Sequence, residues 1–433
     1  MILVYTPVVK PRIRYIFKHF FVFRMQKEIS FTSDLSVFIA HNGPKMSYSD
    51  KPLGNEFFIR AHGLLTEQGI NTVDITVFDY EGLPAFFATS DRSALPFDFF
   101  AASFYLMTRY EEYQPYVPDD LGRFTPDQSL AYQHKFLHIP LVDLWFRYFL
   151  KAWDTFFDAT VASPAIKSPE LTLLVDVPQL FAYKHKAFFR SFFEGIRDLT
   201  KLKFAVFFDR TVVLLGFRED PLAGLLNWLE EFKRTKYSSP IFFVLHTALG
   251  IHDKSLSVFN AANQQGIKSI SDYTPTAPLA SFASSMHPYK LSADIDRFSA
   301  LIHRPVKAIR QHKLALRFPI SYRLFSKLGI QHDYSMQYPD HHGFRASTAF
   351  PFRFYDLSDE QPTPLTIHPV CLSEAHIRNQ RFSRKMRQLF LDYQSRLAEL
   401  QAPFVVALTN KSFNTRSKNA SFLSTLSKVL THE

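Results

Sequence analysis

The sequence holds a single cysteine, Cys371, among 433 residues, so no disulfide can form within the chain. One cysteine fits a reducing compartment. Glycine is also scarce, at 13 residues, and the chain carries no P-loop, no Gly-x-Gly-x-x-Gly and no serine nucleophile elbow. These absences argue against a nucleotide-binding enzyme, a serine hydrolase and a disulfide-stabilised scaffold.

No stretch of the chain approaches the ~18 uninterrupted apolar residues that a membrane-spanning helix needs. The first residues are apolar in part, but Pro7, Lys10, Pro11, Arg12 and Arg14 interrupt them, whereas a secretory signal has an unbroken apolar core. We therefore expect a soluble cytoplasmic protein with no transmembrane segment.

The chain has no excess of acidic residues and is instead basic, with a net charge of +10. A basic surface suits nucleic acid, an anionic membrane face or an acidic polysaccharide. The charges are scattered, and the densest cluster, Arg378–Arg387, is typical of the solvated face of a helix. Because no zinc-finger or RNP motif is present, we expect no nucleic-acid partner.

Phenylalanine is unusually abundant, with 47 residues in 433. Buried phenylalanine is the rule in globular proteins, so this abundance predicts thick aromatic cores. The alternative is an aromatic surface of the kind on which sugars stack. Hydrophobic residues make up 46% of the chain, which is enough for large cores in two or three domains.

The N-terminal part of the chain mixes strand and helix patterns. A polar, proline-bearing stretch at 161–170 is interpreted as an interdomain linker. Before it, the pattern predicts a strand, a helix, a hairpin and two further helices, in this order: Met1–Thr6, Pro11–Phe23, Phe78–Phe87, Asp98–Tyr113 and Ile139–Phe157.

After the linker the pattern changes to apolar runs separated by amphipathic helices. The runs at Leu171–Val177, Ile241–Leu245 and Pro403–Leu408 are typical of strands buried on both faces, as in parallel α/β sheets. Pro221–Lys236 and residues 380–400 repeat apolar side chains at helical spacing. This alternation is typical of a barrel or a doubly wound sheet.

Polar side chains stand where these strands end, which is where α/β folds place their working residues. Asp176 lies near the end of the first run, and His368 follows the short run Leu365–Ile367. Between them come Arg310, His312 and Asp333, followed by Arg345 in a Gly-Phe-Arg-Ala stretch.

Several motifs in this order resemble a bacterial branch of the NodB-like polysaccharide deacetylases. In the second half of the chain they are Val175–Val177, Phe181–Lys186, Arg310–His312, Asp333–Met336, Gly343–Ala346, Pro351–Asp356 and Ile367–Pro369. Upstream, the motifs that resemble the N-terminal domain of this branch are Gly43–Tyr48, Leu95–Asp98, Ser103–Tyr105 and Arg109–Tyr113.

The resemblance implies an α/β fold in two domains. Residues 1–160 are expected to form a smaller mixed α/β N-terminal domain, and residues 171–433 a deformed (β/α) barrel of the polysaccharide deacetylase type. It also implies a reaction, the metal-dependent hydrolysis of an acetamido group on a sugar. In the family pattern, Asp-x-Asp at the first strand end supplies a base and a metal ligand, histidines complete the metal site, and a late histidine is the general acid.

This sequence departs from the family at the metal ligands. Asp176 matches the base, but the expected ligand aspartate is Pro178, which has no side-chain donor. The position expected to carry a ligand histidine aligns with Leu279, and His287 lies three residues past the second. Because a catalytic zinc normally keeps three protein ligands, we expect no bound metal or other cofactor unless the ligands are rearranged.

The resemblance gives each candidate residue a role. Asp176 and His368 occupy the catalytic positions, while Arg310, His312, Asp333 and Arg345 are candidates for substrate binding. Asp176 has a competing interpretation as a helix cap or a partner of Arg310. His368 is equally well read as a hydrogen-bonded core histidine. Arg345 could pair with Asp333 or grip an anionic sugar.

Three functions follow. The first is a deacetylase-like pseudoenzyme that binds a cell-surface or capsular glycan bearing N-acetylated sugars, or a protein partner, in the barrel cleft. The second is an active hydrolase that removes N-acetyl groups with rearranged ligands, such as Asp176 with His287 or His312. The third is a basic, non-enzymatic scaffold in which the candidate residues pair off and fill the cleft.

Overall fold

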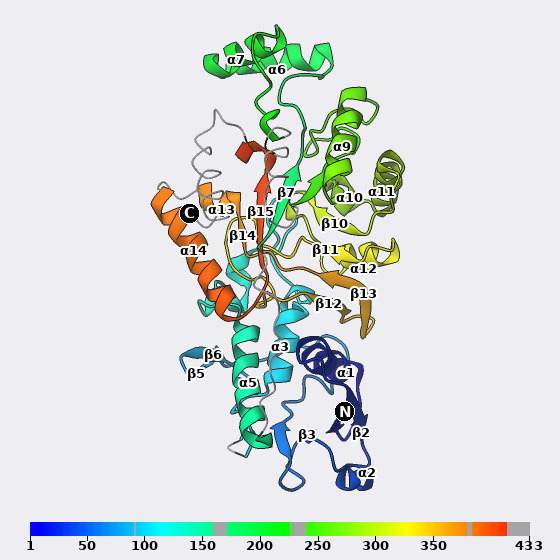
Figure 1. Ribbon diagram of the computed structural model, residues 1–433, viewed down its shortest axis with the longest axis vertical. Helices are drawn as coiled ribbons and strands as arrows, with labels where there is room; N and C mark the ends of the chain where they lie inside the picture. The colour runs from blue at the N-terminus through cyan, green and yellow to red at the C-terminus, as the bar shows by residue number, and fades with distance from the viewer. Residues whose placement is uncertain (91, 159–170, 226–227, 229–239, 379–382, 414–433) are drawn as a thin grey trace. The chain divides into compact units, whose positions relative to one another are not determined.

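The computed structural model describes residues 1–90, 92–158, 171–225, 228, 240–378 and 383–413 (Figure 1). By its internal contacts the chain divides into two compact units. The first contains residues 1–169, 317–371 and 394–404, and the second contains 170–316, 372–393 and 405–433. The predicted linker at 161–170 lies outside the described residues. Contacts thus group residues 317–371 with the N-terminal part, and the predicted domains of 1–160 and 171–433 stay a prediction.

The first unit contains a four-stranded parallel sheet in the order β2-β1-β3-β4. Its strands alternate with helices along the chain. The elements are β1 (Ile2–Tyr5), α1 (Pro11–Phe17) continued by a π-helical turn (Lys18–Arg24), β2 (Ile29–Thr32), α2 (Leu35–Ala40), β3 (Lys45–Ser49) and β4 (Phe57–Arg60). Pro11 at the first position of α1 has no N–H to leave unpaired, which explains why the helix begins there.

The remaining elements of the first unit include the predicted hairpin, formed by the antiparallel strands β5 and β6. Asp98 caps the helix that follows, since its Oδ1 accepts a hydrogen bond from the N–H of Ala101 at 3.0 Å. The elements are β5 (Phe78–Tyr80), β6 (Leu83–Ala85), α3 (Phe99–Met107), α4 (Leu130–Gln133), α5 (Leu141–Phe157), α12 (Ile320–Lys327), β11 (His332–Asp333), β12 (Phe352–Asp356) and β13 (Gln361–Ile367).

Aromatic side chains fill the core of the first unit. The rings of Phe17 and Phe100 stack with their centroids 3.9 Å apart, and those of Phe20 and Phe99 lie 4.4 Å apart. All four side chains are fully buried. The predicted aromatic core is therefore confirmed for this part of the chain, and the predicted segments Met1–Thr6, Pro11–Phe23, Asp98–Tyr113 and Ile139–Phe157 all contain the expected elements.

The second unit is built on strands in the order β10-β9-β8-β7-β15-β14. The pairs β7–β8, β8–β9, β9–β10 and β14–β15 are parallel, as the continuous apolar runs predicted. Strands β7, β8 and β15 are the predicted runs. The strands are β7 (Leu171–Val177), β8 (Ile241–Val244), β9 (Thr276–Ala280), β10 (Ala308–Gln311), β14 (Leu372–Ser373) and β15 (Phe404–Thr409).

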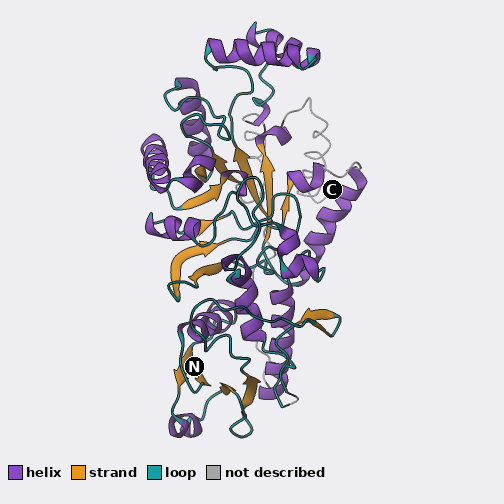
Figure 2. Cartoon of the chain, turned by 180° about the vertical axis from the view of Figure 1, so that it is seen from behind, coloured by secondary structure: helices purple, strands orange, loops and turns teal. Residues whose placement is uncertain are grey.

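Helices connect these strands, and α9 and α11 lie beside the sheet in both views (Figures 1 and 2). Most of the predicted helix Pro221–Lys236 lies outside the described residues, whereas the helix predicted at 380–400 is found as α14. The helices are α6 (Phe188–Thr200), α7 (Phe204–Leu214), α9 (Ala261–Tyr273), α10 (Phe282–Met286), α11 (Pro288–Ile302), α13 (Glu374–Arg378) and α14 (Ser383–Glu399).

The sheet of the second unit is curved. Asp176 on β7 and Arg310 on β10 are joined by a salt bridge although β8 and β9 lie between their strands. Three strand spacings of about 4.8 Å separate β7 from β10, and side chains stand roughly perpendicular to a flat sheet. The two side chains can meet only on the concave face of a curved sheet. Closure of this sheet into a barrel stays a prediction.

Candidate functional site

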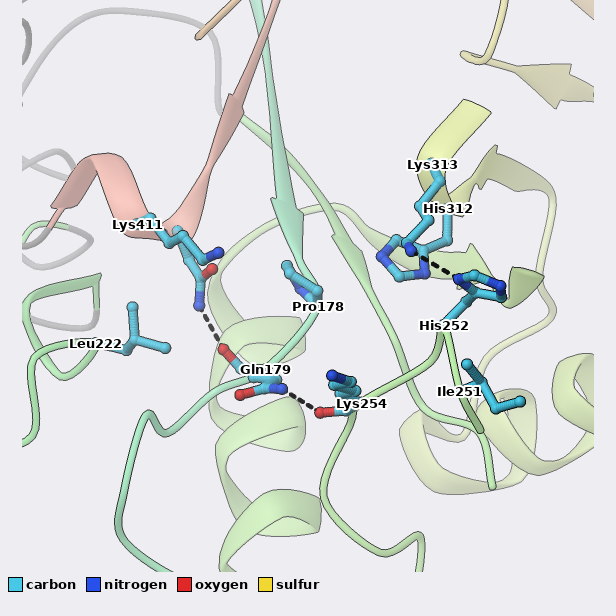
Figure 3. A pocket seen from close by; sticks show the side chains of 10 residues that line it. Pro178, Gln179, Leu222, Ile251, His252, Lys254, His312, Lys313 and Lys411 are labelled. Carbon is cyan, nitrogen blue, oxygen red and sulfur yellow. Dashed lines mark hydrogen bonds between the residues drawn. The ribbon is translucent and has the colours of Figure 1, made fainter. Parts of the chain in front are cut away.

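The carboxyl ends of the strands in the second unit surround a pocket of about 490 Å³. Pro178 and Gln179 follow β7, His312 and Lys313 follow β10, and Asn410 and Lys411 follow β15 (Figure 3). The other lining residues are Leu222, Ile251, His252 and Lys254. The pocket thus lies at the edge of the sheet where parallel α/β folds bind their ligands.

Hydrogen bonds join the loops that line this pocket. Gln179 Nε2 donates to the carbonyl of Lys254, and Asn410 Nδ2 donates to the carbonyl of Gln179 at 2.5 Å (Figure 3). Across the pocket, Lys313 Nζ lies 3.1 Å from Nδ1 of His252. Residues from four loops, after β7, β8, β10 and β15, are therefore fixed relative to one another.

The lining of the pocket is positively charged. Lys254, Lys313 and Lys411 contribute three ammonium groups, and none of the ten described lining residues is acidic. Gln179, Asn410 and the two histidines add further hydrogen-bonding groups, while Leu222 and Ile251 provide apolar surface. This combination suits an anionic ligand that also carries hydroxyl groups and apolar ring faces.

His312 is oriented by a buried carboxylate behind the pocket. Its Nδ1 lies 2.9 Å from Oδ1 of Asp253, which also accepts hydrogen bonds from the N–H groups of Phe282 at 2.8 Å and Ala283 at 2.9 Å. Burial alone raises the pKa of Asp253, but the bonds from His312 and from these N–H groups outweigh it and lower the pKa below its usual value. An ionised Asp253 requires a proton on Nδ1 of His312, so the lone pair of neutral His312 is on Nε2.

Asp176 is held by Arg310 beside the same strand ends. Arg310 Nε lies 2.9 Å from Oδ1 and 3.0 Å from Oδ2 of Asp176. Arg310 is only 2% exposed. The structure shows the pairing with Arg310 that was one of the interpretations open for Asp176, and the catalytic role stays a prediction. Neither residue is among those that line the pocket.

The second unit does not fit the metal that the family resemblance implies. Pro178 lines the pocket where the ligand aspartate is expected. Leu279 is buried within β9, in register with Arg310, where a ligand histidine is expected. His287 is exposed at the start of α11. Among the residues that the structure describes, no three His, Cys, Asp or Glu side chains are grouped so that they could hold a metal ion.

His368 and Asp333 belong to the first unit, where both are engaged in its interior. His368 Nε2 lies 3.1 Å from Nδ1 of His332, and its ring stacks on Tyr334 at 4.4 Å. Burial, helped by the charge of His332, lowers the pKa of His368 to about 3. The lowered pKa favours the neutral imidazole, whose remaining N–H is a weak acid, and the general-acid role of His368 stays a prediction. The buried Asp333 accepts hydrogen bonds from the hydroxyl groups of Tyr322 at 3.0 Å and Ser335 at 2.6 Å.

Arg345 pairs with Glu112. Its Nε and Nη2 lie 2.9 Å and 2.6 Å from the two carboxylate oxygens, and both residues are almost fully buried. Arg109 Nε bonds the same carboxylate at 2.7 Å. Burial raises the pKa of Glu112, but the charges of Arg345 and Arg109 outweigh it and lower the pKa below its usual value. The Arg109–Tyr113 and Gly343–Ala346 motifs are therefore joined by the Arg345–Glu112 ion pair.

His312 is thus the one predicted substrate-binding residue that lines the described pocket. The sequence interpretation missed His252, Lys254, Lys313 and Lys411. Two of the three loops that carry them could be located from the sequence. Lys313 follows His312 directly, and Lys411 follows the strand predicted at Pro403–Leu408. His252 and Lys254 lie in a longer loop after β8, whose path the sequence pattern does not give.

Comparison with known proteins gives a family model and a set of solved structures. Residues 2–158 match the model of a family of unknown function, DUF7033. This match ends close to the predicted domain boundary at 160. A comparison with curated proteins returns no match.

The similar solved structures include members of the family that the sequence motifs resemble. A putative polysaccharide deacetylase from Mycobacterium smegmatis is 14% identical, with 62% of this chain and 85% of that chain covered and a TM-score of 0.39. A probable polysaccharide deacetylase from Pseudomonas aeruginosa PAO1 is 12% identical over 61% and 85% of the chains, with a TM-score of 0.37. PuuE allantoinase is 10% identical over 62% and 87%, with a TM-score of 0.40.

Two of these three solved structures are named as polysaccharide deacetylases, the family that the motifs resemble. No helix in the described part of the chain combines the length and the apolar character that crossing a bilayer requires.

Proposed function

We propose that the protein is a deacetylase-like protein that binds an acidic glycan in the pocket of the second unit without metal-dependent hydrolysis. The observation that carries this proposal is the lining of the pocket, which combines three lysines with no acidic side chain among the described residues. Lysine ammonium groups form charge-assisted hydrogen bonds with carboxylates. A glycan with N-acetylated and carboxylated sugars meets both the charge and the polar, partly apolar lining.

The absence of ligand donors at the family positions supports the non-catalytic part of the proposal. A deacetylase needs a metal-bound water near its base, and Pro178 and Leu279 offer no donor there. Asp176 carries a salt bridge to Arg310 instead. Burial lowers the pKa of His368, which favours the neutral imidazole over the cation that a general acid needs. The charge of the pocket lining suits the binding of an anionic glycan, while positions 178 and 279 offer no metal ligand for the hydrolysis that the family resemblance implies.

The test is calorimetric titration of the full chain with hyaluronan oligosaccharides, which alternate glucuronate with N-acetylglucosamine, in the presence of a chelator. Neutral chitin oligosaccharides, which carry the N-acetyl group alone, are the comparison ligand. We expect binding of the acidic oligosaccharide that weakens as salt is raised. Replacing Lys254→Gln or Lys411→Gln should weaken it by about 3- to 10-fold, because each lost charge-assisted bond contributes roughly 0.7–1.4 kcal/mol.

Lys307→Gln is the matched control, since Lys307 is an exposed lysine of the same unit outside the pocket. Equal loss in the control variant would mean that binding reflects net charge alone. If neither oligosaccharide binds, the glycan proposal fails and the scaffold function gains support.

Hydrolysis is the second candidate, and the Asp253–His312 pair favours it. An imidazole whose Nδ1–H donates to a carboxylate presents Nε2 as a base, and His312 lines the pocket. Release of acetate from an acetylated oligosaccharide by the full chain, lost in His312→Gln, would support this function. If the release of acetate also requires added zinc, the result would support a metal-dependent hydrolase with rearranged ligands.

A further inference from the structure

Helices α6 and α7 form a hairpin whose charged side is buried. Arg210 of α7 donates from Nη2 to Asp198 at 2.7 Å and from Nη1 to Glu194 at 2.8 Å, both on α6. Lys186 Nζ also bonds Glu194, at 2.9 Å. Asp198 and Arg210 are only 6% and 5% exposed. A surface helix ordinarily buries its apolar stripe and exposes its charges. In this hairpin the ion-paired side chains of Asp198 and Arg210 are buried instead.

The outer side of the hairpin is aromatic. The three later phenylalanines of α6 follow Phe188 by one, four and five residues, and these spacings place all four on one face of the helix. Their exposed fractions lie between 54% and 76%, and two phenylalanines of α7 are 60% and 65% exposed. The six residues are Phe188, Phe189, Phe192, Phe193, Phe204 and Phe208. Single exposed apolar residues are common, but six on one short hairpin form a patch that indicates an interaction site.

Cations border this patch. Arg197 lies one helical turn beyond Phe193, and Lys201 and Lys203 lie in the turn between the helices; all three are exposed. The acidic residues Glu194 and Asp198 face inward to Arg210. The outer side of the hairpin is therefore apolar and rimmed by positive charge, the combination that anionic lipid attracts.

We propose that the α6–α7 hairpin docks the protein on the surface of a bilayer that contains anionic lipid. The phenylalanines enter the boundary between headgroups and acyl chains, and Arg197, Lys201 and Lys203 stay at the level of the lipid phosphates. A symmetric contact with a second copy would bring these cations against their own counterparts, which repel. The lipid surface neutralises them. This proposal does not rest on the glycan pocket.

The hairpin is fixed to the body of the second unit by polar contacts at its base. Arg190 Nη1 donates to the carbonyl of Ser255 at 2.9 Å, and the N–H groups of Ala182 and Tyr183 each donate to Asp220 at 2.8 Å. None of these contacts involves a phenylalanine side chain of the patch. Substitutions in the patch are therefore expected to leave the body of the unit intact.

The test is co-sedimentation of the full chain with vesicles of phosphatidylcholine alone or mixed with phosphatidylglycerol. We expect binding to the mixed vesicles that weakens with salt, and little binding to phosphatidylcholine. Phe189→Ser with Phe193→Ser should lower the apparent affinity by at least about 10-fold, because each ring that leaves the interface loses apolar burial. Lys201→Gln with Lys203→Gln should lower it by about 10-fold or more and remove the preference for anionic lipid.

Phe23→Ser is the matched control, since Phe23 is 59% exposed and lies outside the hairpin; its binding should equal that of the unchanged chain. The proposal is overturned if the chain sediments with neither vesicle, or if the phenylalanine variant binds as the control does. It is also overturned if the chain without lipid is a dimer that Phe189→Ser with Phe193→Ser dissociates, because the patch then joins two copies. Circular dichroism checks that each variant keeps its helices.

Discussion

Arg310 holds the carboxylate of Asp176 through its Nε, 2.9 Å from Oδ1 and 3.0 Å from Oδ2. This pair joins β7 to β10 across the concave face of the sheet. Asp176, the residue that the family resemblance assigns as a base, is thereby engaged in a salt bridge. A carboxylate in a salt bridge with a buried arginine has a structural task that needs no metal. The first prediction concerns that task.

Asp176→Asn is expected to lower the free energy of unfolding by about 3 kcal/mol, because it removes a carboxylate that forms an ion pair with the buried Arg310 guanidinium. Replacing both partners with apolar residues, Asp176→Leu with Arg310→Met, should recover part of this loss. Urea denaturation of Asp176→Leu, Arg310→Met and the double variant measures the coupling. Asp272→Asn, a change of an exposed aspartate in the same unit, is the control. A loss in Asp176→Asn no larger than in the control would contradict the prediction.

The purified chain is expected to bind zinc substoichiometrically after equilibration with the metal and removal of the excess. The reason is that Pro178 and Leu279 replace ligand donors and Asp176 is paired with Arg310. Metal analysis by mass spectrometry provides the measurement. Asp176→Ala and His287→Ala should give the same value as the unchanged chain. One equivalent of zinc that disappears in Asp176→Ala would instead establish a rearranged metal site.

Gly343→Ala is expected to destabilise the first unit by about 3 kcal/mol. Gly343 has φ = +123°, and an added Cβ would stand 2.2 Å from the carbonyl oxygen of Leu137. Backbone atoms at that distance have to move. Gly82→Ala is the matched control, because Gly82 also has a positive φ, +77°, but no atom within 4 Å of its added Cβ. The control should lose only about 1 kcal/mol. Equal losses in urea denaturation would show that the close approach to Leu137 does not matter.

The α6–α7 hairpin is expected to lose stability as the pH falls. Burial raises the pKa of Glu194, but hydrogen bonds from Arg210 and Lys186 outweigh it and lower the pKa from 4.5 to about 2. A depressed carboxyl pKa contributes stability that is present above the unfolded value of 4.5 and is lost as the pH falls towards 2. Hydrogen exchange of the hairpin amides across this interval should show decreasing protection.

Glu194→Gln removes the titrating group, so its hairpin should be less stable at pH 7 and should depend less on pH below 4.5. Glu399→Gln, a change of an exposed glutamate outside the hairpin, should keep the slope of the unchanged chain. A steep slope that persists in Glu194→Gln would assign the acid sensitivity to other carboxyl groups.

Local pattern gave reliable predictions where one periodicity dominates a segment. The run Leu171–Val177 is found as β7 with the predicted bounds, since seven mostly apolar residues with β-branched members suit a strand buried on both faces. The hairpin at Phe78–Phe87 and the helix at 380–400 were found for similar reasons. The family motif Arg310–His312 led to His312, which does line the pocket.

Partners and exposure could not be predicted in the same way. Arg345 was expected to meet Asp333 or a ligand, but it meets Glu112, which is 233 residues away along the chain. The abundance of phenylalanine predicted buried cores. The prediction of burial is confirmed for Phe17 and Phe100. It is wrong for Phe188 and the neighbouring phenylalanines on α6, which are exposed. An amphipathic pattern shows that a helix has two faces, but not which face the rest of the chain will cover.

The sequence alone determined that the family's ligand donor is missing at position 178, because side-chain chemistry is fixed by residue identity. It also determined the parallel strands, because their apolar runs reflect burial on both faces. Only the tertiary structure decided that Asp176 pairs with Arg310, that three lysines from separate loops line one pocket, and that the charges of α6 and α7 face each other. These arrangements depend on contacts between segments far apart in sequence, and no local spacing encodes those contacts.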